Sequence, residues 1–312
     1  MLIRQKNKLN KPKVLVILGP TSSGKTRLGV SLAREFNGEI ISADSRQVYR
    51  GLDIGTGKDL AEYGVGQNKI KYHLIDVVNP EDNFDVAKYQ KLAWRAIDSV
   101  LKRKKLPIII GGSGLYLQAL VDNYKLSTVK PNEKKRKIWE KLSALELFEK
   151  LKKLKPEFAA RVNNSDRNNK RRLVRYLEII EQGDLEMTGK QEAPYNFLIL
   201  GLTSSDKILK QRIIQRLLDR LEKEGLVAEV KRLNRAGVSW QKLINFGLEY
   251  KFVSHYLQNK LNYEELVEKL STAIYRFSKR QKTWFRRWEK QGAKIKWVKN
   301  KLTAEREIKK WL

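Results

Sequence analysis

The sequence predicts an α/β protein whose parallel sheet is interrupted by a helical insertion. Three observations lead to this expectation. Short apolar runs alternate with helical patterns up to about residue 121, a basic stretch without convincing strands follows, and the strand pattern returns at residues 197–202. Strands that alternate with helices are typical of βαβ units and therefore of a parallel sheet. We expect one catalytic core formed by residues 1–121 and 195–312, and an inserted helical domain formed by residues 122–194.

The first predicted strand and helix flank a phosphate loop. The apolar run 14–18 ends at Gly19, and a helical pattern runs from Lys25 to about Glu35. Residues 19–26 read GPTSSGKT, the complete phosphate-loop pattern in its strand, loop and helix context. Backbone N–H groups of such a loop surround phosphate oxygens, while its threonine ligates Mg²⁺. We predict a P-loop NTPase-like core that binds a di- or triphosphate through Gly19, Thr21, Ser22, Ser23, Gly24, Lys25 and Thr26, with Thr26 also a ligand of the Mg²⁺ cofactor.

The strand that usually carries a hydrolytic carboxylate lacks one. Residues 107–110 form an apolar run that ends in GGSGLY at 111–116, whereas P-loop ATPases place an acidic residue at this point. The run 39–42 instead delivers Asp44 to the carboxyl edge of the sheet, where open α/β folds bind ligands. Asp44 is therefore our candidate base, and a helix-capping role beside Ser45 is the open alternative.

Five segments together resemble the bacterial tRNA dimethylallyltransferases. They are GPTSSGKT (19–26), ISADSRQVYRGLDIGTGK (41–58), YHLIDVVNPED (72–82), IIIGGSGLY (108–116) and KRQKTWFRRW (279–288), and the resemblance runs from about Val14 to Trp288. It implies transfer of a dimethylallyl group from dimethylallyl diphosphate to N6 of adenosine 37 in the tRNA anticodon loop. It also implies a nucleoside-kinase-like core with a tRNA-binding insertion. The phosphate loop would then hold a leaving group, so no hydrolytic carboxylate is needed.

The same resemblance implies roles for single residues. Asp44 would accept the N6 proton, and Ser113, where many relatives carry Thr, would hydrogen-bond the bridging diphosphate oxygen. Arg216 would neutralise diphosphate charge, although a solvated position on a basic helix is an equal alternative. The tRNA-binding residues would be Asp44, Ser45, Arg46, Gln47, Arg171, Arg172, Arg175, Lys279, Arg280, Gln281, Trp284 and Arg286.

The composition independently predicts a polyanionic partner. The chain has 65 Lys and Arg against 35 Asp and Glu, a formal net charge of +30. Such a charge favours nucleic-acid binding, although a general lysine bias could explain part of it. Residues 168–178 and 279–288 concentrate the cations, and the second cluster interleaves them with aromatic rings, as recognition of unpaired bases requires. Trp284 and Trp288 lie four residues apart, so core packing is an equal alternative for the rings.

Several classes of protein are excluded or kept open by the remaining features. The chain has no cysteine, which excludes disulfides and thiolate metal sites, and no apolar stretch approaches the length of a membrane span. We therefore expect a cytoplasmic protein without a membrane partner, and the resemblance implies a monomer. A nucleoside or small-molecule kinase and a non-catalytic RNA-binding protein remain alternatives, and ATP-dependent phosphorylation would identify the kinase.

Two further expectations concern the end of the chain. Residues 247–250 read GLEY where relatives commonly carry Gly-Tyr, a basic residue and Glu, so an aromatic contact made there would be lost or displaced. Residues 294–298 have the pattern of an edge strand, and residues 302–312 have that of a short amphipathic helix.

Overall fold

The structure is a computed structural model that describes residues 11–64, 66, 69–127, 129–183 and 189–312. The chain forms two compact units, one of residues 1–121 and 193–312 and the other of residues 122–192. The second boundary lies two residues before the predicted one. The chain has already joined the first unit at Ala193, whose carbonyl accepts a hydrogen bond from Lys11 Nζ at 2.8 Å.

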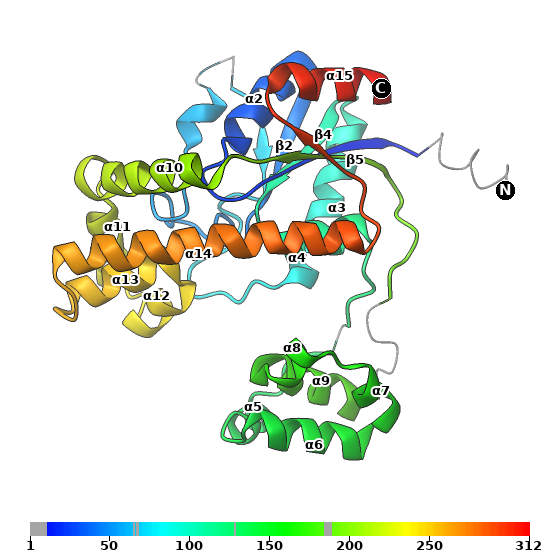
Figure 1. Ribbon diagram of the computed structural model, residues 1–312, viewed down its shortest axis with the longest axis vertical. Helices are drawn as coiled ribbons and strands as arrows, with labels where there is room; N and C mark the ends of the chain where they lie inside the picture. Colours follow the sequence, from blue (N-terminus) through cyan, green and yellow to red (C-terminus); the bar gives the residue numbers. More distant parts are fainter. Residues whose placement is uncertain (1–10, 65, 67–68, 128, 184–188) are drawn as a thin grey trace, which may run out of the picture. The chain divides into compact units, whose positions relative to one another are not determined.

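A parallel sheet forms the centre of the first unit. Within the described residues its strands are β1 (Lys13–Leu18), β2 (Gly38–Ala43), β3 (Tyr72–His73), β4 (Leu106–Gly111), β5 (Asn196–Leu202) and β6 (Ile295–Val298). They pair in the order β3-β2-β4-β1-β5-β6, and every pairing is parallel (Figure 1). The predicted α/β fold is confirmed, and the predicted edge strand near the C-terminus is β6.

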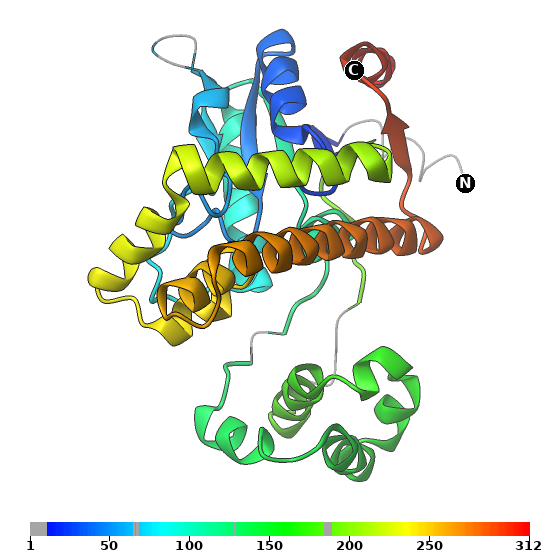
Figure 2. The same cartoon turned by 60° about the vertical axis from the view of Figure 1, so that its left-hand side comes forward.

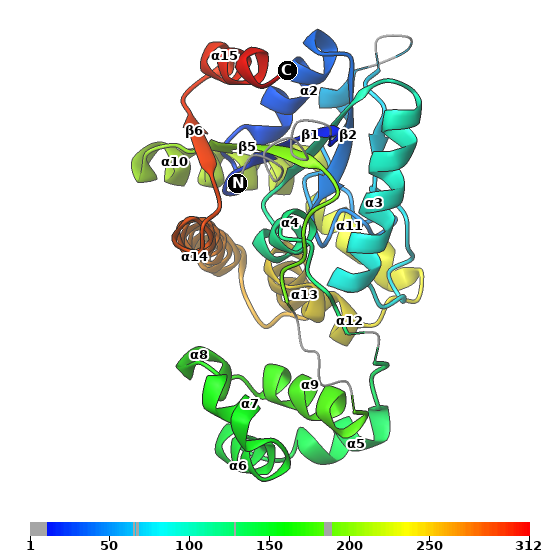
Figure 3. The same cartoon turned by 90° about the vertical axis from the view of Figure 1, so that its right-hand side faces the viewer.

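Helices cover both faces of this sheet. Alternate residues of β1 point to opposite faces: Val14, Val16 and Leu18 pack into one core, and Leu15 and Ile17 pack into the other. The first core contains α3 (Val86–Lys102), α4 (Gly114–Val121) and the end of α14 (Tyr263–Lys290), and the second contains α2 (Lys25–Glu35) and α15 (Lys301–Trp311) (Figure 3). All strand residues of β1 after Lys13 are buried because both faces are covered.

A separate helical layer lies beside the carboxyl edge of the sheet. It comprises α10 (Asp206–Asp219), the π-helical turn η3 (Arg220–Glu224), α11 (Leu226–Arg235), α12 (Trp240–Phe246), α13 (Leu248–Leu257) and the first half of α14 (Figure 2). Its core also includes Val48, Tyr49 and Leu52 from the loop after β2. The short 3₁₀ helix η1 (Leu60–Tyr63) follows that loop. The loop after β2 is therefore held between the sheet and this helical layer.

The second unit is helical, with its own core. Its helices are α5 (Glu133–Trp139), α6 (Ala144–Leu154), α7 (Pro156–Arg161), α8 (Asn164–Arg167) and α9 (Lys170–Glu181). Side-chain caps fix where they begin: Ser143 forms a capping box at α6, and Asn169 caps α9. Buried Trp139, Leu147 and Leu173 contribute to one cluster within the unit. The helical character that the sequence predicts for this segment is thus observed.

Candidate active site

The phosphate loop is built by the tight passage from β1 to α2. Gly24 precedes the helix with a φ of 87°, a conformation that glycine adopts without strain. A Cβ on Gly19 would lie 2.6 Å from the Leu202 carbonyl oxygen, so a larger residue cannot fit there. The Ser23 amide closes the turn by donating to the Pro20 carbonyl at 3.3 Å. Ser23 Oγ is buried and has no hydrogen-bond partner among the described residues, which leaves it available to a ligand.

The turn after β2 fixes Asp44. Its Oδ1 accepts the backbone N–H of Arg46 at 2.8 Å and that of Gln47 at 3.4 Å. The local capping role and the position in the site are therefore both realised, since the same side chain lines the cavity described below. The Ser45 amide donates to Ser113 Oγ at 3.2 Å, which joins this turn to the end of β4.

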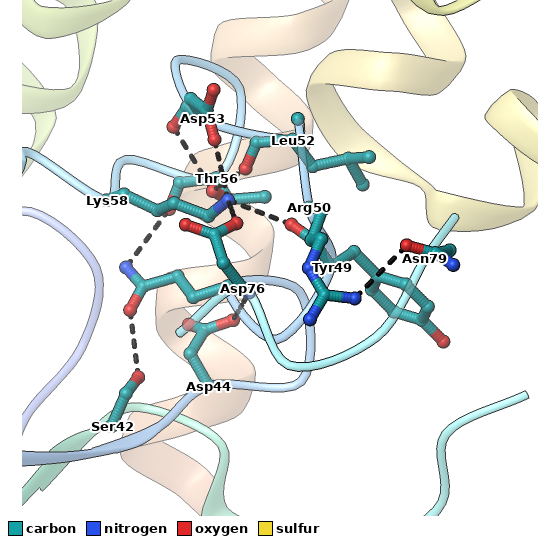
Figure 4. Close-up of polar contacts among 12 residues, drawn as sticks. Ser42, Asp44, Tyr49, Arg50, Leu52, Asp53, Thr56, Lys58, Asp76 and Asn79 are labelled. Atoms are coloured by element: carbon teal, nitrogen blue, oxygen red, sulfur yellow. Dashed lines mark hydrogen bonds and ion pairs between the residues drawn. The ribbon is translucent and has the colours of Figure 1, made fainter. Parts of the chain in front are cut away.

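The buried Lys58 holds the rest of this loop in place. Its side chain is 1% exposed, and its ammonium donates to the Tyr49 carbonyl at 2.8 Å, to Asp53 Oδ1 at 2.6 Å and to Asp76 (Figure 4). Figure 4 shows the side chains of Asp53 and Asp76 approaching the ammonium, with Asp44 nearby. A buried cation with two carboxylate partners is satisfied by the fold, so Lys58 stabilises the loop and does not need a ligand.

A cavity of about 370 Å³ lies where these segments meet. It is strongly polar, with five cationic side chains against the two carboxylates of Asp44 and Glu249. A second cavity of about 310 Å³ shares Lys25, Thr26 and Arg216 with it. The polar and charged residues that line the first cavity include Thr21, Lys25, Thr26, Asp44, Ser45, Arg46, Gln47, Ser113, Arg216, Arg220, Glu249, Arg280 and Gln281.

The two predicted phosphate-binding cations, Lys25 and Arg216, line both cavities. Burial lowers the pKa of Lys25 from 10.5 to about 8; the negative charge of Asp44 opposes this shift, and the positive charge of Arg216 adds to it. The Lys25 ammonium also donates to the Pro20 carbonyl at 3.2 Å. Arg216 forms an ion pair with Asp59, and burial together with Arg220 lowers its pKa. The site therefore gathers positive charge that a bound anion would stabilise.

Comparison with known proteins identifies the family. The family model described as IPP transferase matches residues 47–288. The chain belongs to the IPP transferase family. A protein named tRNA dimethylallyltransferase 1 from Syntrophus aciditrophicus is 46% identical over 290 residues, which cover 91% of this chain and 93% of the relative.

Solved structures agree with this family. The full-length tRNA isopentenylpyrophosphate transferase from Bacillus halodurans is 36% identical, with a TM-score of 0.66 over 93% of this chain and 90% of that one. A structure entitled as a eukaryotic dimethylallyltransferase acting on tRNA is 26% identical, with a TM-score of 0.69 over 88% of this chain and 69% of that one. Within the described residues, no helix of this chain combines the length and the apolar character needed to cross a bilayer.

The cluster on α14 contains exposed cations and a buried side chain, Gln281, that hydrogen-bonds the phosphate loop. Arg280 and Arg286 are exposed, and Arg280 also lines the cavity. Lys279 is exposed as well and forms an ion pair with Asp206. Gln281 is buried: its Oε1 accepts the Thr21 amide at 2.8 Å, and its Nε2 donates to the Gly112 carbonyl at 2.9 Å. The Gln281 amide therefore fixes the phosphate loop, and its tRNA contact stays a prediction.

The ring of Trp284, for which the sequence left base stacking and core packing open, has contacts within the protein. Its Nε1 donates to Gln118 Oε1 at 3.1 Å, and the Arg287 guanidinium lies 4.4 Å from the ring centroid. A Cβ on Gly114 would lie within 2.8 Å of the ring, so the ring packs against the backbone there. Trp288 is fully buried in the core. For these tryptophans the packing alternative describes the structure.

The predicted tRNA-binding arginines of α9 have different surroundings from one another. Arg171 is exposed, whereas Arg172 forms an ion pair with Asp166. Arg175 donates to Glu178 Oε2 at 3.2 Å and to the Val129 carbonyl at 2.8 Å. Arg172 and Arg175 therefore form ion pairs within the helical unit while their side chains stay 41% and 31% exposed, and Arg171 is exposed as well.

Three residues that line the cavity were not among the predicted site residues: Arg220, Glu249 and Gly57. Arg220 follows Arg216 by four residues, and this helical spacing could have placed both on one face. Glu249 was noted only as a departure from the family pattern, yet it lines the cavity. In the same segment Tyr250, the residue after Glu249, is buried and donates to Glu229 Oε1 at 2.7 Å. Tyr250 also lines the cavity, so the GLEY segment contributes both a carboxylate and an aromatic ring to the cavity wall.

Proposed function

We propose that this member of the IPP transferase family transfers a dimethylallyl group from dimethylallyl diphosphate to N6 of adenosine 37 in tRNA and releases diphosphate. The observation that carries the proposal is the single cavity lined by Lys25, Thr26, Asp44, Ser113 and Arg216. It places an anion-binding loop opposite a carboxylate at the carboxyl edge of a parallel sheet. Anion binding and proton removal are the two tasks that alkylation of an amine by a diphosphate ester requires.

The cationic side chains would stabilise the leaving group. As the bond between the dimethylallyl carbon and oxygen breaks, its electron pair moves to the diphosphate. Lys25 and Arg216 would bind the oxygens on which this charge develops, and the Ser113 hydroxyl would donate to the bridging oxygen. Because the Lys25 pKa is about 8 in the free site, an arriving diphosphate would readily stabilise its charged form.

Asp44 would act as the base. The N6 nitrogen forms the new bond to carbon, and the proton that it then loses would pass to the Asp44 carboxylate. Oδ1 is held by the turn, whereas Oδ2 accepts no hydrogen bond from the described residues. This geometry orients the carboxylate and keeps one oxygen available for the proton. The adenine base must leave its stack to reach Asp44, and the cavity offers an enclosed position for it.

The residues of the phosphate loop fit a magnesium ion. Thr26 lines both cavities, and the buried Ser23 hydroxyl lacks a partner within the described residues. The described part of the chain contains no group of three or more His, Cys, Asp or Glu side chains that could hold a metal. Mg²⁺ would therefore depend on Thr26 together with diphosphate oxygens and water, the oxygen ligands it prefers. When bound, it neutralises charge on the leaving diphosphate.

The tRNA would bind through its anticodon stem-loop to exposed cations. The net charge of +30 would attract the polyanion. Arg46 and Arg280 line the cavity, and Arg286 is exposed on α14. Arg46 lies over the Phe246 ring, 5.5 Å from its centroid, which gives it a defined position. We further propose that the enzyme acts as a monomer in the cytoplasm, where its tRNA substrate is found.

Transfer of radiolabelled dimethylallyl to unmodified total tRNA tests the proposal. Wild type should label tRNA with Mg²⁺ present, and Asp44→Asn should abolish labelling because the amide can still accept the turn N–H groups but cannot take a proton. Asp98→Asn is the matched control, since Asp98 accepts from Tyr195 Oη at 2.7 Å and does not line the cavity. Absence of label in tRNA, with phosphoryl transfer from added ATP, would overturn the proposal in favour of a kinase.

A further inference from the structure

Arg220 is buried at the wall of the cavity and is incompletely paired. It begins the π-helical turn η3, and its side chain is among the most enclosed charged groups of the protein, with the residue 6% exposed. One terminal nitrogen lies 3.3 Å from Glu249 Oε1, while Nε has no hydrogen-bond partner among the described residues. An unpartnered buried donor costs free energy unless a ligand satisfies it. Turns of this π type often occur at functional sites.

Arg216 and Arg220 converge on one point of the backbone. A Cβ on Gly57 would collide with a terminal nitrogen of each guanidinium. Gly57 also has a φ of 62°, so this position favours glycine both by space and by backbone conformation. The two guanidinium groups therefore lie close together at the wall of the cavity that Lys25 and Thr26 also line.

The side chains around Arg220 carry more positive than negative charge, which favours an anion. Glu249 is its carboxylate partner, as Asp59 is the partner of Arg216. Among the side chains that line the cavity, Lys25, Arg46 and Arg280 add three more cations, whereas Asp44 is the other carboxylate. A small, highly charged anion fits this excess better than a tRNA phosphate, because Arg220 is buried and a nucleic-acid backbone follows exposed cations.

We propose that Arg220 binds the diphosphate as a second leaving-group arginine beside Arg216, and that Glu249 is a positioning residue that aims its guanidinium. The proposal rests on the proposed function and names a further residue for the same site. As carbon–oxygen cleavage delivers an electron pair to the diphosphate, the free Nε–H and a terminal N–H of Arg220 donate to its oxygens. Glu249 keeps the remaining face of the guanidinium in place and prevents it from folding back toward the helical core.

The test compares Arg220→Gln with Arg235→Gln, a control on α11 whose side chain is exposed and does not line the cavity. Calorimetry with inorganic diphosphate and Mg²⁺ measures binding, and steady-state kinetics with dimethylallyl diphosphate and tRNA measures activity. Loss of hydrogen bonds to a charged group predicts about 10- to 100-fold weaker diphosphate binding in Arg220→Gln, with the KM for tRNA unchanged. Arg220→Lys should recover part of the affinity, and the control should match wild type.

A double variant distinguishes a ligand role from a purely structural one. Arg220→Met combined with Glu249→Leu replaces the buried pair by apolar side chains of similar size, which commonly preserves folding. If Arg220 served only the fold, this variant would bind diphosphate as wild type does, and the proposal would fail. A raised KM for tRNA with unchanged diphosphate binding in Arg220→Gln would likewise overturn it. Either result, with wild-type transfer to tRNA intact, would leave the proposed function standing, whereas a wild type without transfer would contradict that function itself.

Glu249→Gln tests the positioning role separately. The amide keeps a hydrogen-bond acceptor but loses the charge that opposes Arg220. We expect a lower kcat, by about tenfold, with a smaller change in diphosphate affinity, because a misaligned donor costs more as charge develops than in the ground state. An unchanged kcat would refute the positioning role of Glu249.

Discussion

Arginines of α9 and arginines of α10 and η3 form ion pairs with carboxylates, but only those of α10 and η3 line the active-site cavity. On α9, Arg172 pairs with Asp166, whose other oxygen accepts from Tyr176 Oη at 2.7 Å inside the helical unit. Arg216 and Arg220 also have carboxylate partners, but both line a cavity. A cation paired beside a cavity can exchange its carboxylate for a phosphate ligand. On α9 the carboxylate partner Asp166 is nearly buried while the Arg172 side chain is 41% exposed, so loss of Arg172 leaves that carboxylate with one partner fewer. Asp166 lines neither of the two cavities from which a ligand could replace that partner.

This comparison predicts opposite outcomes for the same substitution at the two places, and this is the largest effect. Arg216→Gln should lower kcat/KM for dimethylallyl diphosphate on the order of 10²- to 10³-fold while the melting temperature changes little, because the lost interaction forms with the leaving group. Arg172→Gln should change kcat/KM only a few-fold but destabilise the helical unit by about 1 kcal/mol, because Asp166 loses one partner while solvent screens the exposed side of the pair. Kinetics and thermal unfolding of both variants measure this difference.

The comparison would break if the two variants behaved alike. Equal loss of activity without loss of stability would mean that the pair on α9 also opens to bind a phosphate. Equal loss of stability would mean that the ion pair of Arg216 with Asp59 holds the fold and is not exchanged for a ligand. A helpful control is Arg161→Gln, an exposed position of α7 that should leave both measurements unchanged.

The pH dependence of diphosphate binding sharpens the comparison at the cavity. The Lys25 pKa is lowered to about 8 in the free site, chiefly by burial, so the ammonium is favoured again when diphosphate binds. The contribution of this charge to affinity is present below about pH 8 and is lost as the pH rises above it, by up to about tenfold per pH unit. Titration with isopentyl diphosphate, a saturated analogue, measures the affinity of wild type and of Lys25→Met.

Lys25→Met should bind weakly at every pH and lack this slope. A wild-type affinity that stays constant from neutral pH to well above 8 would show that Lys25 does not take up a proton on binding. The arginines nearby cannot produce the slope, because a guanidinium stays charged across this range.

The sequence could predict the strands, the phosphate loop and Asp44 because each depends on local pattern. The run 14–18 is apolar because both faces of β1 are covered, and GPTSSGKT specifies the turn that follows it. Asp44 directly follows β2, and the carboxyl ends of parallel strands meet at one edge. The family and its tRNA-prenylating activity, expected from five short segments, are confirmed by the comparisons.

What the sequence could not predict depends on contacts between distant residues. Gln281 joins Thr21 to Gly112 across 260 and 169 positions, so its amide could not be assigned to the loop from its own neighbours. The cluster 279–288 shows alternating cations and rings, but only the tertiary structure reveals that Arg280 lines the cavity while Lys279 pairs with Asp206. Arg220 and Glu249 are likewise brought together by tertiary structure, 29 positions apart.

Arg171 gives the smallest expected effect and the clearest test of what exposure means on α9. Its side chain is exposed, whereas its neighbour Arg172 is paired with Asp166. If Arg171 contacts a single tRNA phosphate, Arg171→Gln should weaken tRNA binding only a few-fold, and the slope of log affinity against log salt should fall by about one. Filter binding of unmodified tRNA at several salt concentrations measures both, with Arg161→Gln as the control. An unchanged salt slope would show that exposure alone does not make an arginine of this unit a tRNA contact, because every phosphate-bound cation must release counterions from the tRNA.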